Sequence, residues 1–201
     1  MKKRIALILA VVLLLGIAVG ATIAWLTDST EEVKNTFTTS TIGVELDETE
    51  REYKMIPGWT IDKDPWAKIT ADSEDGYLFV QVTSNMEITK NENGTYSVGE
   101  YLDYAIDTQW TLVDGTTNVF YIENPTKGAA YNILGEGTNT YDGEAYSWAD
   151  DQVLVKPTVT KKMMAALIDE PTLTFQAYAT QLKKNNTTKF TAAEAWELVE
   201  P

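Results

Sequence analysis

The chain has 201 residues, of which 44% are hydrophobic and 10% aromatic, so one folded domain is expected and global disorder is excluded. Its net charge of −14 disfavours nucleic acid as a partner, because phosphate groups carry the same sign. Cysteine and histidine are absent, which excludes disulfides, nucleophiles of either type, and zinc sites built from them. We therefore expect a protein that is not an enzyme and binds no cofactor.

The first 24 residues have the layout of an export signal. A basic start, MKKR, precedes a long apolar run and then small residues. Small residues permit cleavage after Ala24, which we favour and which makes Trp25 the new N-terminus, or after Ala21. The alternative is that the segment is not cleaved and remains as a membrane anchor, because residues 5–27 carry no charge and are long enough to cross a bilayer. In either case the rest of the chain lies outside the cytoplasm, and it contacts the membrane only through this segment.

Short β-strands are predicted along most of residues 25–201, which we interpret as a single domain. In residues 76–84, Leu78, Val80 and Val82 alternate with Tyr77 and Phe79, a pattern typical of a strand buried on both faces. Similar alternation predicts further strands in residues 40–48, 103–113, 118–123 and 172–181.

Turn signals separate these strands. Asn93-Gly94 and Asp114-Gly115 have strand-like sequence on both sides and are predicted to close hairpins. Repeated short strands with such turns indicate a β-sandwich or barrel. Two short helices are expected, one at residues 160–170 and one that begins at Thr191 with a capping box to Glu194 and buries Trp196.

Two groups of residues are candidates for ligand sites. Asp72, Glu74 and Asp75 supply oxygen ligands for calcium, but an acidic turn at a strand end is the simpler interpretation. The second group, which could stack on sugars or simply fill the core, consists of Trp59, Trp66, Trp110 and Trp148. A hydrolase built on two carboxylates is a further alternative, although 30 acidic residues produce chance pairs.

Three blocks of sequence carry a family resemblance. They are "GATIAWLTDSTEEVKNTFTTSTIGVEL", "PGWTIDKDPWAKI" with the following "YLFVQV", and the tail segments "FQAYATQ" and "FTAAEAWE". Together they resemble the TasA/camelysin-like secreted proteins of Gram-positive bacteria, which carry a SipW-type signal peptide. The resemblance implies a jelly-roll-like sandwich, processing by a SipW-type signal peptidase, and a place on the cell surface or in the biofilm matrix.

The same resemblance implies assembly into fibres. The N-terminal segment freed by cleavage would add as a strand to the next copy, with Trp25, Leu26, Val33 and Phe37 as its apolar contacts. The open alternatives are that residues 25–37 fold onto their own sandwich or stay loose, and that the partner is another matrix or cell-surface component. A metallopeptidase activity, with which some members have been labelled, is rejected because histidine ligands are lacking. The alternative function is a module that binds a ligand or polysaccharide.

Overall fold

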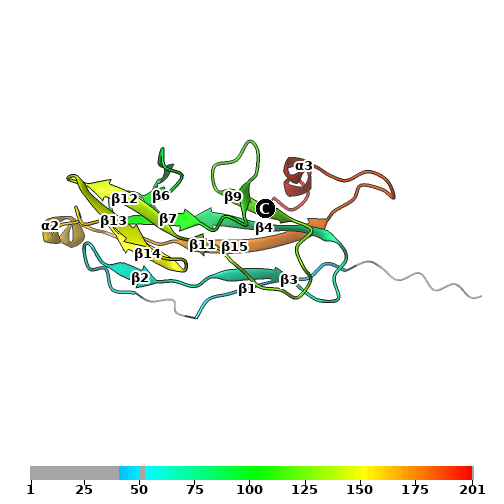
Figure 1. The fold of residues 1–201 in the computed structure, drawn as a ribbon, viewed down its shortest axis with the longest axis horizontal. Helices are drawn as coiled ribbons and strands as arrows, with labels where there is room; N and C mark the ends of the chain where they lie inside the picture. The colour runs from blue at the N-terminus through cyan, green and yellow to red at the C-terminus, as the bar shows by residue number, and fades with distance from the viewer. Residues whose placement is uncertain (1–40, 50–52, 201) are drawn as a thin grey trace, which may run out of the picture. The chain divides into compact units, whose positions relative to one another are not determined.

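Antiparallel β-strands make up most of the regular structure (Figure 1). The computed structural model describes residues 41–49 and 53–200, which belong to the unit of residues 40–201. Strands face one another in two layers, with short helices on a connection and near the C-terminus. The fold is therefore the all-β, jelly-roll-like antiparallel sandwich that the sequence and the family resemblance predict.

One layer is a four-stranded sheet centred on β4. Strand β4 (Gly76–Thr83) pairs with β15 (Thr174–Gln181) along its whole length of eight residues. On its other side β4 pairs with β9 (Val119–Glu123), which pairs in turn with β8 (Thr111–Leu112). Among the described strands β15 pairs only with β4, so its second edge lacks a ladder.

The opposite layer consists of two sheets. In the first, β1 (Val44–Asp47), β3 (Trp66–Ile69) and β10 (Tyr131–Asn132) pair in that order. In the second, the order is β2, β14, β7, β6 and β5, and β11 also pairs with β7. Their bounds in that order are Thr60–Asp62, Gln152–Val155, Leu102–Ile106, Tyr96–Val98, Ile88–Lys90 and, for β11, Leu134–Gly135. The remaining strands, β12 (Gly137–Tyr141) and β13 (Glu144–Trp148), form a separate hairpin.

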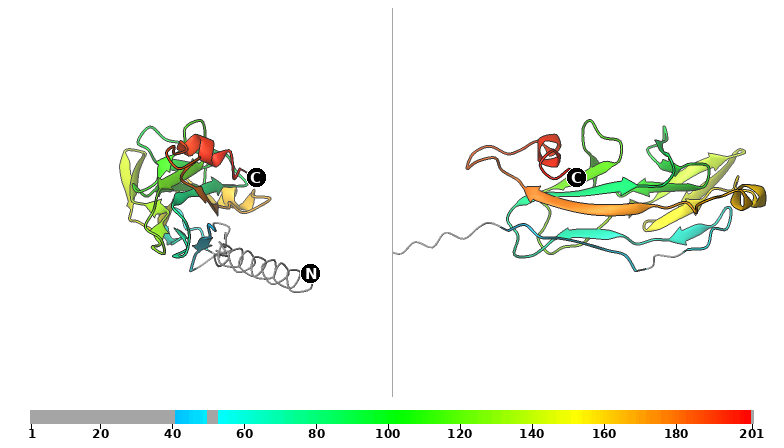
Figure 2. Two further views of the ribbon diagram at one scale, coloured as in Figure 1. Left: turned by 90° about the vertical axis from the view of Figure 1, so that its right-hand side faces the viewer. Right: turned by 180° about the vertical axis from the view of Figure 1, so that it is seen from behind.

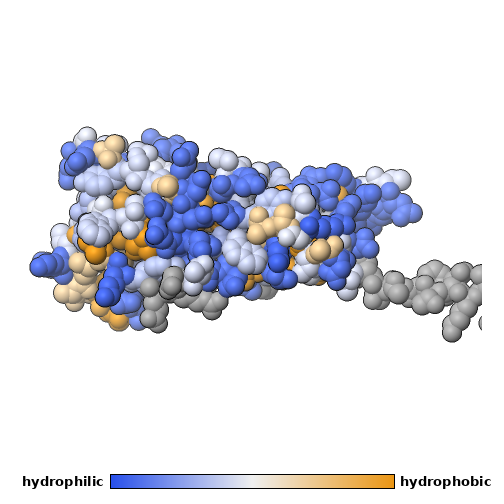
Figure 3. Space-filling view, turned by 60° about the horizontal axis from the view of Figure 1, so that its bottom comes forward, coloured by the Kyte–Doolittle hydropathy of each residue, from blue (hydrophilic) through white to orange (hydrophobic). Residues whose placement is uncertain are grey.

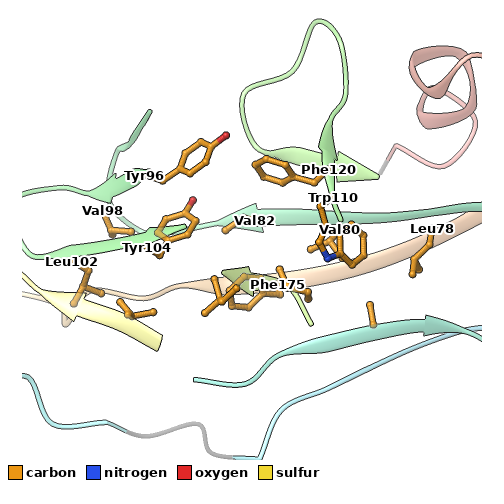
Figure 4. Close-up of a cluster of buried hydrophobic side chains, with 14 of the residues drawn as sticks. Leu78, Val80, Val82, Tyr96, Val98, Leu102, Tyr104, Trp110, Phe120 and Phe175 are labelled. Carbon is orange, nitrogen blue, oxygen red and sulfur yellow. The ribbon is translucent and has the colours of Figure 1, made fainter. Parts of the chain in front are cut away.

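The main core lies between the layers (Figure 4). Leu78, Val80 and Val82 enter it from one face of β4 and are completely buried. Leu102 and Tyr104 enter it from β7 in the opposite layer. One apolar face of residues 76–84, formed by Leu78, Val80 and Val82, thus points into the main core, as the alternation predicts.

The outer faces of β4 and β7 are covered too. Phe79 projects from the outer face of β4 and packs against Trp196 of helix α3 (Ala192–Trp196), with ring centroids 5.5 Å apart. Figures 1 and 2 show α3 on the side of β4 that faces away from β1 and β3. On the outer face of β7, Ala105 packs against Trp148 of the β12–β13 hairpin. The predictions of a strand buried on both faces and of a core-facing Trp196 are confirmed.

Three glycine-containing dipeptides close hairpins. Asn93-Gly94 lies between β5 and β6, and Asp114-Gly115 lies between β8 and β9, as predicted. Asp142-Gly143 closes the tightest hairpin, because these two residues alone separate β12 from β13. Both have positive φ angles, 53° and 84°, which a type I′ turn requires.

Helix α2 is shorter than predicted. It covers Lys161–Ala165, with Thr160 as its N-cap, and not the whole of residues 160–170. The chain leaves the helix to reach Asn85, whose side-chain amide donates to the carbonyl oxygen of Glu170 (2.9 Å) and accepts from the backbone N–H of Thr172 (2.9 Å). These bonds anchor the connection beside the end of β4.

Residues 103–113 form two strands and not the single one predicted. Strand β7 ends at Ile106 and β8 begins at Thr111 in the opposite layer. Asp107 forms the turn that separates the two strands. Its side chain accepts a hydrogen bond from the backbone N–H of Gln109 (2.9 Å), and its carbonyl oxygen accepts one from the backbone N–H of Trp110 (3.0 Å). The apolar alternation continues across the turn because both strands contribute to the same core.

The capping box of α3 gives a pH-dependent contribution to stability. Hydrogen bonds from the Lys184 ammonium and from Thr191 lower the pKa of Glu194 from 4.5 to about 2. Because the folded-state pKa is the lower one, this contribution is present above pH 4.5 and is lost as the pH falls through about 2. We expect Glu194→Gln to unfold at a lower temperature than the wild type near neutral pH, with the difference closing in that acid range.

Thermal unfolding followed by circular dichroism at several pH values measures this difference. Glu197→Gln, at the C-terminal end of the same helix, is the matched control for loss of a carboxylate. A difference that stays constant between pH 4.5 and 2 would contradict the assignment to Glu194.

Candidate functional site

A groove lined by both apolar and polar side chains opens between the two layers at the end where α2 lies. It encloses 1180 Å³ and is lined from three strands of one layer by Ile61, Leu102 and Val153. The other apolar lining residues come from the segment before β2, from α2, and from the connection between α2 and β15. They are Met55, Met164, Leu167, Ile168, Pro171 and Leu173. Figure 3 shows hydrophobic side chains gathered at this end of the molecule. The sandwich is therefore not closed here.

The rim of the groove exposes apolar surface and a strand edge. Ile168 is 97% exposed, which is unusual for a large apolar side chain in a well-packed domain. Thr172 and Thr174, at the start of β15, line the groove beside the edge of β15 that lacks a ladder. An extended peptide laid along this edge would gain backbone hydrogen bonds and apolar contacts together.

Two lysines, Lys54 and Lys63, line the groove, and the charge of Lys63 is paired within the wall. The Nζ of Lys63 lies 2.5 Å from an oxygen of Glu48, and the hydroxyl of Tyr53 donates to that oxygen at 2.8 Å. The same Nζ lies 5.4 Å from the ring centroid of Phe175. Because the ammonium is neutralised at the wall, the aliphatic part of Lys63 presents apolar surface to the groove.

A second, polar hollow lies beside the β12–β13 hairpin. This amide pocket, 450 Å³ in volume, is lined by Asn91, Glu92, Asn93, Ser97, Asn139, Thr140, Tyr141 and Lys156. Asp103 lies next to it on the outer face of β7 and is completely buried. Burial and the hydrogen bond to Asp103 raise the pKa of Tyr141, so its hydroxyl remains a donor to that carboxylate.

The residues predicted for processing and strand donation lie outside the described residues. They are Ala24 and Trp25 at the cleavage site, with Leu26, Val33 and Phe37 in the donor segment. Their roles therefore remain predictions.

The four candidate sugar-stacking tryptophans do not share a surface. Trp110 and Trp148 are buried in separate clusters, with 6% and 4% of their surfaces exposed. Trp66 is half-buried beneath Lys68, and Trp59 is 64% exposed. No exposed row of these four side chains exists on either layer.

The acidic turn has ordinary structural partners. Asp75 forms an ion pair with Lys127 at 3.0 Å, and the backbone N–H of Glu74 donates to the carbonyl of Thr41. Within residues 41–49 and 53–200, no group of three or more acidic side chains is placed to hold a metal ion. Each hollow is lined by a single carboxylate, Glu170 in the groove and Glu92 in the amide pocket.

Sequence reasoning missed both hollows. The groove joins residues from segments up to 121 positions apart, Tyr53 to Thr174, and no local pattern marks it. Asp103 alternates with the apolar residues of β7, and this pattern predicts a side chain that faces solvent. Only the cover supplied by the β12–β13 hairpin makes it a buried carboxylate.

Comparisons with protein-family models, with curated proteins and with solved structures found no match. In the part of the chain that the structure describes, neither short helix approaches the length or apolar content needed to span a bilayer.

Proposed function

We propose that this chain is a secreted, non-enzymatic protein of the bacterial cell surface or biofilm matrix that assembles into fibres. After cleavage by a SipW-type signal peptidase, residues 25–37 of one copy fill the groove of the next. The observation that carries the proposal is the groove itself, a partly apolar opening lined by the start of β15, a strand that pairs on one side only among the described strands.

The donor segment suits such a groove. Trp25, Val33 and Phe37 are spaced by even numbers of positions, so an extended backbone would project all three to one face. Leu26 would project to the opposite face. Three apolar side chains would enter the groove while the backbone pairs with β15.

The direction of the chain favours a neighbour's groove over its own. Thr41 accepts from the backbone N–H of Glu74, next to Gly76, where β15 ends. The groove lies at the other end of β15. The eight extended residues of this strand place its two ends about 25 Å apart. Strand β1 starts at this end and runs toward the groove. A head-to-tail contact with the next copy does not close on itself and so produces a filament.

We expect Leu173→Glu to abolish filaments. A glutamate at the groove rim would be buried by the incoming strand without a partner, at a cost of about 3 kcal/mol, which is roughly a hundredfold in affinity. The matched control is Leu198→Glu, the same change at an exposed leucine near the C-terminus, away from the groove. Electron microscopy and sedimentation of the exported protein measure the result.

Mixing two defective proteins tests the polarity of the contact. A variant that lacks residues 25–37 keeps its groove, and Leu173→Glu keeps its donor segment, so together they should form dimers but no fibres. Monomeric wild-type protein at high concentration, or filaments of Leu173→Glu, would refute this mode of assembly.

A second candidate function is polysaccharide binding. The amide pocket favours it, because the exposed Glu92 and Thr140 of its lining can hydrogen-bond to sugar hydroxyls. Calorimetric titration of Leu173→Glu monomers with cell-surface polysaccharide separates this function from assembly.

A further inference from the structure

The carboxylate of Asp103 joins four side chains beneath the β12–β13 hairpin. Its Oδ1 accepts from the hydroxyl of Ser97 at 2.7 Å and lies 3.5 Å from Nζ of Lys156. Its Oδ2 accepts from Nδ2 of Asn139 at 2.7 Å and from the hydroxyl of Tyr141. An amine, a carboxamide and a carboxylate are thus held together in a protected place.

The carboxamide of Asn139 is polarised from both ends. Its oxygen accepts from Nδ2 of Asn93 at 2.6 Å, while its nitrogen donates to Asp103. The hydroxyl of Thr95 lies 3.1 Å from the same oxygen but is nearer to Oδ1 of Asn93, at 2.8 Å. A donor on a carbonyl oxygen stabilises the negative charge that develops there when a nucleophile adds to the carbon. The arrangement therefore favours attack on Cγ of Asn139.

Lys156 supplies a nucleophile nearby. Its side chain is 11% exposed, its Nζ donates to the carbonyl of Gly99 at 2.9 Å, and it borders the amide pocket together with Asn139. Oδ1 of Asp103 lies 3.5 Å from Nζ and is placed to take a proton from it. A neutral lysine amine is an effective nucleophile.

We propose that Lys156 and Asn139 react to form an intramolecular amide bond. Nζ of Lys156 adds to Cγ of Asn139, the Nζ–Cγ bond forms, and the Cγ–Nδ2 bond breaks. Asp103 accepts protons from Nζ and delivers them to Nδ2, which leaves as ammonia. Neither oxidant nor cofactor is consumed, and Asp103 returns to its carboxylate form once the extra proton of the lysine ammonium has left with the ammonia as an ammonium ion.

The bond would replace a kind of reinforcement that this chain lacks. Without cysteine it has no disulfides, the usual covalent links of proteins outside the cell. Asn139 lies in β12 and Lys156 directly follows β14, so the bond would fix the covering hairpin to the sheet beneath it. The inference is independent of fibre assembly.

Mass spectrometry of the purified, exported protein tests the bond. We expect an intact mass lower than that of the same chain without the bond by one ammonia molecule. Glutamyl endopeptidase cuts after Glu144, between the two residues, so the digest should contain residues 137–144 joined to a peptide that contains Lys156. A full intact mass in the wild type would overturn the proposal.

Two variants separate the cross-link from other losses of ammonia. Lys156→Arg keeps the positive charge but removes the amine nucleophile, and Asn139→Ala removes the carboxamide. Both should show their full masses and no joined peptides. A loss of ammonia that persists in Lys156→Arg would mean that Asn139 has cyclised onto its own backbone, and this outcome also overturns the proposal.

Discussion

Replacing Phe79 with alanine is expected to lower the free energy of unfolding by about 3–5 kcal/mol. Phe79 is completely buried on the outer face of β4, where Trp196 of α3 packs on it. Truncation leaves a cavity between the strand and the helix that the surrounding backbone cannot fully fill. Urea unfolding with an unchanged m-value measures the loss as a shift in the midpoint.

Two further variants show whether β4 is buried on both faces. Leu78→Ala, on the inner face, should lose a comparable amount, about 2–5 kcal/mol. Phe190→Ala, at a partly buried position beside the same outer cluster, should lose less. If Phe79→Ala costs under about 1 kcal/mol, as typical surface changes do, α3 does not cover the strand in solution.

Replacing Asp103 with alanine is expected to lower the free energy of unfolding by about 3–5 kcal/mol. Asp103 is completely buried and is the counter-ion of Lys156, whose side chain is 11% exposed. Its removal prevents the proposed bond, so that Lys156 keeps a nearly buried ammonium without an anion, and it deprives Asn139 and Tyr141 of their acceptor. Urea unfolding again measures the loss, with Asp169→Ala as the control at an exposed aspartate.

A double variant tests the cause of that loss. Asp103→Ala combined with Lys156→Met removes both charges, and it should recover part of the stability because no buried ion is left unpaired. Asp103→Ala as stable as Asp169→Ala would show that the cluster is hydrated in solution and contributes little.

Local sequence patterns were sufficient to predict the elements whose signals come from neighbouring residues. The alternation of residues 76–84 predicted β4 and its two buried faces, and the capping box from Thr191 predicted α3. Both signals depend on neighbouring residues alone. The same logic predicted the Asn93-Gly94 and Asp114-Gly115 hairpins.

Prediction failed where distant contacts decide the structure. Residues 103–113 were predicted as one strand because their apolar residues alternate without interruption. The alternation continues across the turn, since Tyr104 and Trp110 are buried in the same core. The end of α2 depends on Asn85, which is far from it in sequence. The groove and the buried Asp103 are products of the same kind of long-range packing, so no candidate site could be placed from the sequence in advance.

The uninterrupted ladder between β4 and β15 has a mechanical consequence. In the proposed fibre, each copy is held through its N-terminal segment at one end and through the start of β15 at the other. Tension along the fibre then runs parallel to these strands and loads their eight residue pairs in shear, so that they resist together. A load at right angles would open the same ladder one pair at a time. The placement of the groove at the start of β15 thus directs pulling forces into the geometry in which a β-ladder resists best.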